Sequence, residues 1–232
     1  MLQDIALWER FAPYQEHSPD WKSYKAFAGD RSDTVSKRIR MLSLAQLVRQ
    51  VSRVEGSFAE CGCGAGGSAD IIARAMTRCG RNDRLLLFDS FEGLSRPSPE
   101  DFQRSPAHID MFGIQTGLAN GRKFFAADLS AAQASLAGHD FIEFFKGWIP
   151  ERFGEVADRR FAFVHIDVDL YRPTKASLEF FYPRLGDGGV IQIDDYNFMD
   201  WPGATKAVDE FLASANPRFF YQLALGGAFL IK

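Results

Sequence analysis

Two short apolar runs in the second half of the chain set the first expectation about its fold. Phe161 to Ile166 and Val190 to Ile193 are rich in β-branched and aromatic residues, which is typical of buried strands in a parallel sheet. Pro173 suits a first helical turn, and the apolar stripe of LEFFYPRL continues a helix that the glycine-rich run 186–189 is expected to stop. The segment therefore predicts a β-α-β unit, whose crossover brings the carboxyl ends of both strands side by side.

The rest of the chain divides into zones of different periodicity. Residues 57–91 have the pattern strand, glycine turn, helix, strand, whereas the prolines and glycines of 92–123 predict a long surface loop, with a lid and a disordered segment as alternatives. Residues 124–232 resume the alternation and end in two apolar runs around Gly226-Gly227, a hairpin signature. We expect an α/β fold with a doubly wound, mostly parallel sheet, a reversed C-terminal hairpin and an N-terminal helical extension.

Residues 1–55 have a helical pattern and are predicted to form a cap or lid on a main domain over 56–232, with the loop insertion at about 92–123. In this stretch the apolar positions fall on one helical face and the basic positions are expected largely elsewhere. The apolar positions are Leu44, Leu47, Val48, Val51 and Val54, and the basic ones are Lys37, Arg38, Arg40, Arg49 and Arg53.

Charge and cysteine content narrow the function classes. The formal net charge of −3 gives no general attraction for a phosphate backbone, so a nucleic-acid partner is not expected. Of three cysteines, Cys61 and Cys63 share a glycine-rich turn whose spacing fits neither a disulfide framework nor a zinc site. We therefore expect a reduced, cytoplasmic setting, and the sequence shows neither a signal peptide pattern nor a run of membrane-spanning length.

Carboxylates gather where the two predicted strands end. Asp167 and Asp169 follow the first strand, and Asp194 and Asp195 follow the second. Because those strand ends are expected to be neighbours, the four side chains should converge, and like charges within a few Å raise one another's pKa values and repel. A hard divalent ion, which prefers oxygen ligands, would neutralise them.

The glycine-rich turn ECGCGAGGSA supports two interpretations. Read as G-x-G-x-x-G with Asp89 about 20 residues later, it matches a dinucleotide site. Read as E-x-G-x-G-x-G, it matches the first motif of S-adenosylmethionine-dependent methyltransferases. Glu60 would repel a pyrophosphate but attract a sulfonium and an ammonium, so the second interpretation is favoured. In both, Asp89 is placed to accept hydrogen bonds from ribose hydroxyls.

Five segments in this order, ECGCGAGGSA, LLLFDSFEGL, HIDVDLY, RLGDGGVIQIDDY and WPGATKAVDEF, resemble the macrocin-type sugar O-methyltransferases. These are magnesium-dependent class I enzymes with a Rossmann-like fold that methylate deoxysugars of antibiotics. The resemblance implies that Asp167, Asp194 and Asp195 hold Mg²⁺ and that the glycine turn and Asp89 hold S-adenosylmethionine. It also implies N-terminal helices over the active site and a homo-oligomer. The first motif departs from the family at Cys63-Gly64-Ala65, which leaves the acceptor open.

On this hypothesis the chain transfers a methyl group to a hydroxyl of a sugar with adjacent hydroxyls, on a natural-product glycoside or a surface polysaccharide. Asp167 is expected to bind the ion and accept the proton, with Asp169 as the competing base. Tyr196 and Trp201 are the candidates for the acceptor site, and Trp148 either stacks on the cofactor or belongs to the core. The full set of predicted cofactor residues is Glu60, Gly62, Gly64, Gly66, Ser68, Asp89, Ser90, Gly147 and Trp148.

Two alternatives stay open at this point. Asp167-Val168-Asp169 also fits the DxD clamp of a metal-dependent nucleotide-sugar glycosyltransferase, although that leaves Glu60 and the Asp194-Asp195 pair unexplained. The other alternative is a non-catalytic protein that binds S-adenosylmethionine. The cost of holding four acids together counts against it.

Overall fold

The structure is a computed structural model that describes residues 19, 20, 22, 35–102 and 125–232. Most of the predicted N-terminal cap and residues 103–123 of the predicted loop insertion lie outside the described residues. Within the described part of that insertion, one helical turn, η2 (Pro99–Asp101), is formed. None of the described helices has the length and apolar character needed to cross a membrane.

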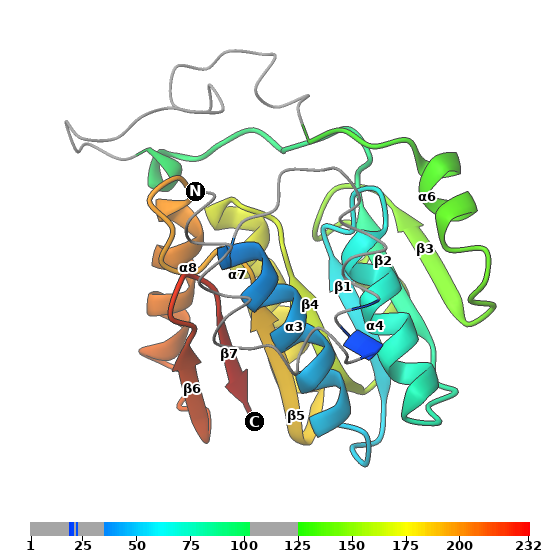
Figure 1. Ribbon diagram of the computed structural model, residues 1–232. Helices are drawn as coiled ribbons and strands as arrows, with labels where there is room; N and C mark the ends of the chain where they lie inside the picture. Colours follow the sequence, from blue (N-terminus) through cyan, green and yellow to red (C-terminus); the bar gives the residue numbers. More distant parts are fainter. Residues whose placement is uncertain (1–18, 21, 23–34, 103–124) are drawn as a thin grey trace.

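A seven-stranded sheet forms the centre of the fold (Figure 1), in the order β3-β2-β1-β4-β5-β7-β6. The first five strands along this order are parallel, and β7 is antiparallel to both β5 and β6, as the terminal hairpin predicted. The strands are β1 (Ser57–Cys61), β2 (Leu85–Asp89), β3 (Ile142–Lys146), β4 (Phe161–Ile166), β5 (Leu185–Ile193), β6 (Phe219–Gln222) and β7 (Ala228–Ile231).

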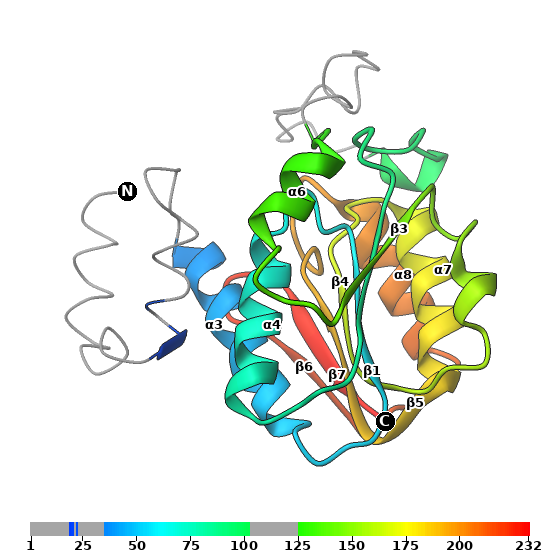
Figure 2. The ribbon, with the colours of Figure 1, turned by 90° about the vertical axis from the view of Figure 1, so that its right-hand side faces the viewer.

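Helices cover both faces of the sheet, so the predicted doubly wound architecture is confirmed (Figure 2). On one face lie α3 (Val35–Gln50), α4 (Gly67–Arg78) and α6 (Leu129–Ser135). On the other lie α7 (Tyr171–Phe181) and α8 (Pro202–Leu212), with the short turns η3 (Phe153–Val156) and η4 (Tyr182–Arg184).

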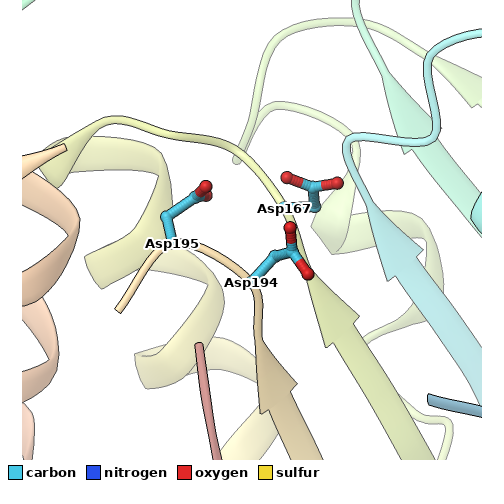
Figure 3. A group of neighbouring side chains, drawn as sticks. All are labelled: Asp167, Asp194 and Asp195. Carbon is cyan, nitrogen blue, oxygen red and sulfur yellow. The ribbon is translucent and has the colours of Figure 1, made fainter. Parts of the chain in front are cut away.

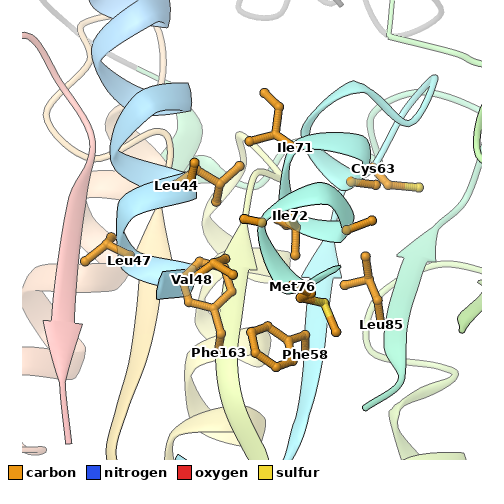
Figure 4. Packing of buried hydrophobic residues seen from close by; sticks show 14 of the residues in the cluster. Leu44, Leu47, Val48, Phe58, Cys63, Ile71, Ile72, Met76, Leu85 and Phe163 are labelled. Atoms are coloured by element: carbon orange, nitrogen blue, oxygen red, sulfur yellow. The ribbon is translucent and has the colours of Figure 1, made fainter. Parts of the chain in front are cut away.

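The helix α3 packs into the main hydrophobic core, with Leu44 and Val48 fully buried in the same cluster as Phe58, Phe163 and Ile72 (Figure 4). The sequence pattern suggested that the basic residues of this helix lie largely on the solvent side. Two of them do not. Arg38 is only 2% exposed. Arg40, four residues before Leu44, lies on the face that looks toward the sheet and forms an ion pair at the end of β5. The helix α3 is thus part of one helical layer of the α/β fold.

The glycine-rich run 186–189 does not stop a helix, which corrects that prediction. It lies inside β5, whereas α7 ends at Phe181 and is followed by Pro183, which cannot extend an α-helical ladder. Glycine is needed there for packing. A Cβ on Gly186 would lie 3.0 Å from Val54 Cγ1, and one on Gly189 would lie 2.9 Å from the carbonyl oxygen of Gly186. The run lets β5 begin close beneath the loop that follows α3.

Candidate active site and metal centre

Three carboxylates converge at the carboxyl ends of β4 and β5 (Figure 3). Asp167 follows β4, Asp194 and Asp195 follow β5, and one ligand oxygen from each lies within 4.8 Å of the others. Backbone hydrogen bonds fix these strand ends, because the amide of Asp167 donates to the carbonyl of Cys61 and that of Asp194 to the carbonyl of Ile166, both at 2.9 Å. The parallel β-α-β connection therefore brings these acids together, as expected from their positions.

Asp169 lies next to these three carboxylates, and its backbone supports one of them. Its backbone has a φ of 60°, in the left-handed region, and its amide donates a 2.8 Å hydrogen bond to Oδ2 of Asp195. The main chain after Asp167 therefore turns and holds the Asp195 carboxylate. Asp169 is buried and also lines the cavity described below, so it remains within reach of a ligand there.

The electrostatics of the cluster are those of crowded, buried acids. Burial, followed by repulsion from neighbouring carboxylates, raises the pKa of Asp167, Asp169 and Asp195 well above the ordinary value of 3.8. Burial would raise the pKa of Asp194 as well, but Arg40 and His165 outweigh it and lower this pKa. Asp194 is therefore the acid of the group that stays ionised most readily.

Arg40 and His165 flank Asp194 from two other elements. Nε of Arg40 donates to Oδ2 of Asp194 at 2.8 Å, and Nε2 of His165 faces Oδ1 of the same carboxylate at 3.7 Å. His165 is fully buried, and its Nδ1 lies 2.8 Å from Oε1 of Glu60. Sequence reasoning assigned no site role to Arg40 or His165. The four- and eight-residue spacing from Arg40 to Leu44 and Val48 is a signal that could have placed Arg40 on the inner face.

The donor set fits a hard divalent cation. Carboxylate oxygens on one Mg²⁺ at about 2.1 Å would lie about 3 to 4 Å apart, a distance that small side-chain rotations reach from the observed spacing. Oδ1 of Asp194 is buried and has no hydrogen-bond partner in the described part of the chain, so it is available as a ligand. Three carboxylates are crowded together, and Arg40 forms an ion pair with only Asp194 among them, so a cation would relieve the repulsion within the group.

A cavity of about 500 Å³ opens beside the acidic group and extends along the glycine-rich turn between β1 and α4. Its walls are formed by the ends of β1, β2, β4 and β5 and by one face of α3. It is lined by most of the predicted cofactor and metal residues and by one predicted acceptor residue: Gly62, Gly64, Ser68, Asp89, Ser90, Trp148, Asp167, Asp169, Asp194, Asp195 and Trp201.

Gly62 and Gly64, two of the glycines of this turn that line the cavity, serve different purposes. A Cβ on Gly62 would lie 1.7 Å from the carbonyl oxygen of Asp167, so glycine lets β1 and β4 meet closely behind the metal centre. Gly64 has a φ of +48° and nothing within 4 Å of a Cβ position. That open space in the cavity wall is a cradle where a ligand can approach the backbone.

Asp89 lies at the end of β2 with both carboxylate oxygens facing backbone amides. Oδ2 accepts from the amide of Gly64 at 2.8 Å and Oδ1 from that of Phe91 at 2.7 Å. Burial raises its pKa, which these hydrogen bonds partly offset. Each carboxylate oxygen accepts two hydrogen bonds, so Asp89 still has capacity for ribose hydroxyls. The geometry fits the adenosine half of S-adenosylmethionine in the cavity.

Four predicted site residues do not line the cavity. Glu60 is fully buried against His165, and Gly66 is the N-cap of α4. Gly147 directly precedes Trp148, and its amide donates to the carbonyl of Asp89 at 3.0 Å. The hydroxyl of Tyr196 donates to Oδ1 of Asp209 on α8 at 2.9 Å, so this side chain is directed away from the cavity.

Comparison with known proteins agrees with this arrangement. The sequence profile of the family Macrocin-O-methyltransferase (TylF) matches residues 17–217. The chain belongs to this family. The matched region contains all five segments on which the resemblance was based, and with them the acids and glycines of the site.

Two proteins similar in sequence to this chain come from Streptomyces. The 8-demethyl-8-(2,3-dimethoxy-alpha-L-rhamnosyl)-tetracenomycin-C 4'-O-methyltransferase of Streptomyces olivaceus is 32% identical over 62% of this chain and 54% of its own length. The demethyldecarbamoylnovobiocin O-methyltransferase of Streptomyces niveus is 25% identical over 75% of this chain and 65% of its own. The chain thus spans between about half and two thirds of the length of these two relatives.

Solved structures share the fold. The O-methyltransferase NovP superposes with a TM-score of 0.67 at 22% identity, covering 90% of this chain and 96% of that one. The calicheamicin methyltransferase CalS11 superposes with a TM-score of 0.66 at 21% identity, covering 92% of this chain and 93% of that one. Both likenesses confirm the class I methyltransferase architecture. Family membership favours the methyltransferase hypothesis over the glycosyltransferase alternative.

Proposed function

We propose that the protein is a Mg²⁺-dependent, S-adenosylmethionine-dependent O-methyltransferase that acts on a sugar hydroxyl. One observation carries this proposal: the oxygens of Asp167, Asp194 and Asp195 converge on the same cavity that Gly64 and Asp89 line. A methyl donor bound along the glycine turn and a cation held by the acids would then meet in one space. The family membership supports the same reaction.

The cofactor half of the cavity is assigned to the turn after β1 and to the end of β2. Gly64 lets a ligand approach the backbone, Asp89 accepts hydrogen bonds from ribose hydroxyls, and Ser68 and Ser90 add hydroxyl groups to the same walls. Trp148 offers an aromatic face for the adenine ring. These groups hold the donor and orient its methyl group toward the acids, which is how alignment contributes to the rate.

The acceptor half is assigned to the acidic group. A bound Mg²⁺ supplies positive charge that lowers the pKa of an acceptor hydroxyl. Asp167, Asp194 and Asp195 would hold the ion, and burial keeps bulk water from competing with these ligands. Asp167 is the first candidate to accept the hydroxyl proton, and Asp169, which lines the same cavity, is the second.

The acceptor class follows from the relatives. The tetracenomycin enzyme of Streptomyces olivaceus is named for a methylated rhamnosyl group, and another relative and a structural neighbour are named for novobiocin and calicheamicin. We infer an acceptor sugar with adjacent hydroxyls, as part of a natural-product glycoside. Trp201 and Phe125, whose ring centroids lie 5.8 Å apart, line the cavity and offer aromatic surface for a sugar ring.

The test combines binding and turnover. Titration calorimetry should show saturable binding of S-adenosylmethionine, and a panel of rhamnosylated acceptors should give S-adenosylhomocysteine only with Mg²⁺ present. Asp167→Asn should abolish turnover while S-adenosylmethionine affinity stays within about twofold. Full turnover in excess chelator would contradict the metal role, and absence of S-adenosylmethionine binding would contradict the activity itself.

A further inference from the structure

Four charged side chains from four separate elements form a row beneath the cavity. Glu60 on β1 contacts His165 on β4, His165 faces Asp194 at the end of β5, and Arg40 on α3 closes the row. The successive distances are 2.8 Å, 3.7 Å and 2.8 Å. Glu60 and His165 are fully buried, and the side chains of Asp194 and Arg40 are 6% and 14% exposed.

The sheet register creates this row. Glu60 pairs with His165 across β1 and β4, and His165 pairs with Gln192 across β4 and β5. Asp194 is two residues beyond Gln192 and therefore emerges on the same face, as Asp167 does two residues beyond His165. The pair Glu60 and His165 thus lies directly under the two strand ends that carry the metal ligands.

The two carboxylate oxygens of Asp194 have different contacts. Oδ2 is fixed by the 2.8 Å hydrogen bond from Arg40, whereas Oδ1 faces His165 Nε2 at 3.7 Å, which is beyond hydrogen-bond length. Oδ1 has no hydrogen-bond partner among the described residues. His165 therefore opposes the charge of Asp194 without occupying the lone pairs of Oδ1, which stay open toward the acidic group.

Glu60 is what holds the imidazole in this orientation. Its Oε1 binds Nδ1, which directs Nε2 toward Asp194, and Glu60 lines no part of the cavity. The sequence motif assigned Glu60 to the positive groups of the cofactor, whereas in this structure its carboxylate is fully buried and bonded through Oε1 to a histidine. Carboxylate-histidine pairs that orient metal ligands are a recurring device in metal sites.

We propose that Glu60 and His165 are positioning residues of the metal centre, which orient the Asp194 carboxylate for a divalent cation. The inference rests on the proposed function, since it assumes that Asp194 binds the ion. It links the first motif of the chain, after β1, to the metal rather than to the methyl donor.

The test measures metal and cofactor binding separately, without turnover. Mn²⁺ affinity is measured by electron paramagnetic resonance, and S-adenosylmethionine affinity by calorimetry in chelator. Glu60→Gln keeps the shape and an acceptor oxygen for Nδ1 but removes the charge. We expect it to weaken Mn²⁺ binding about tenfold and to change S-adenosylmethionine affinity less than about twofold. His165→Gln should give the same split.

Glu143→Gln is the matched control, because it makes the same change on β3, which β2 separates from β1, and Glu143 pairs there with Arg84 and Arg159 away from the metal centre. It should alter neither affinity. If either single variant does not fold, the double variant Glu60→Gln and His165→Gln replaces the charged pair by two amides and should show the same loss of Mn²⁺ affinity.

The outcomes separate the two proposals. Weaker S-adenosylmethionine binding with unchanged Mn²⁺ binding in Glu60→Gln would overturn the inference and return Glu60 to the cofactor. Unchanged affinity for both ligands would also overturn it, while leaving the proposed function intact. Absence of Mn²⁺ binding in the unaltered protein would overturn the metal centre itself and this inference with it.

Discussion

Nε of Arg40 lies 2.8 Å from Oδ2 of Asp194, although 154 positions separate the two residues in the chain. The contact joins α3 to the end of β5 and places one guanidinium among several buried acids. The acids in turn raise the pKa of Arg40 against the opposing effect of burial, which is the largest single influence on it. The ion pair therefore ties the N-terminal helix to the metal centre.

Replacing Arg40 with Met should destabilise the metal-free protein by roughly 3 kcal/mol, because Asp194 would keep a buried charge without its closest partner. Mg²⁺ should then raise the melting temperature of the variant more than that of the unaltered protein, since the ion supplies the missing positive charge. Scanning calorimetry with and without Mg²⁺ measures both effects.

The control for this change is Arg74→Met. Arg74 forms an exposed ion pair with Asp70 within α4, so its removal should change stability by less than about 0.5 kcal/mol, with no dependence on Mg²⁺. Equal responses of the two variants to Mg²⁺ would show that Arg40 has no part in the charge balance of the metal centre.

Gly64→Ala and Gly62→Ala should have different effects although they are two residues apart. Gly64→Ala meets no atom within 4 Å, so we expect about 1 kcal/mol of backbone strain and an S-adenosylmethionine affinity that falls about tenfold as the methyl group enters the cavity. Gly62→Ala would place a Cβ 1.7 Å from the Asp167 carbonyl oxygen, which should cost more than about 2 kcal/mol and disturb metal binding.

Gly80→Ala is the control for the glycine turn. Gly80 also has a positive φ and open space around a Cβ, but it lies beyond the end of α4 and does not line the cavity. Chemical denaturation should show a similar strain to that of Gly64→Ala, and calorimetry should show unchanged cofactor affinity. A tenfold loss in the control as well would mean that strain, not the cavity, governs binding.

Mg²⁺ binding should release protons and become tighter as the pH rises. The pKa values of Asp167 and Asp195 in the folded protein are raised above the ordinary 3.8, chiefly by burial. Their contribution to stability is therefore present below that value and is lost as the pH rises through the raised pKa values, where the folded chain binds more protons than the unfolded chain. A cation takes the place of those protons.

Calorimetry at one pH in two buffers of different ionisation heat counts the protons released. We expect Mg²⁺ binding to release protons at about pH 5.5 and fewer protons at about pH 8. Asp167→Asn should release fewer protons than the unaltered protein. Equal Mg²⁺ affinity at both pH values, with no proton release, would contradict raised pKa values in this group.

Tyr196 and Trp201 should behave differently in acceptor binding. Tyr196→Phe removes a hydrogen bond to Asp209 outside the cavity, so it should cost about 1 kcal/mol of stability and leave the acceptor KM unchanged. Trp201→Phe reduces the aromatic wall of the cavity, so it should raise the acceptor KM with little change in the affinity for S-adenosylmethionine. Steady-state kinetics with an identified acceptor compares them, and a higher KM in Tyr196→Phe alone would reverse this assignment.

The apolar runs predicted β4 and the core of β5 because buried parallel strands need continuous hydrophobic sequence, and the acids at their ends followed from the same parallel geometry. The prediction failed where local preference met tertiary packing. The glycine-rich run 186–189 is typical of a helix stop in isolation but lies in a strand, where the loop after α3 leaves little space for a side chain at Gly186.

The sequence by itself determined the order of the elements, the reversed hairpin and the gathering of acids at one edge of the sheet, since periodicity and parallel topology fix these. Only the tertiary structure decided the partners of those acids. Arg40 reaches Asp194 from a helix, Glu60 turns inward to His165, and Tyr196 turns away to α8. A charged or polar side chain takes its role from what packs against it, and those neighbours come from distant parts of the chain.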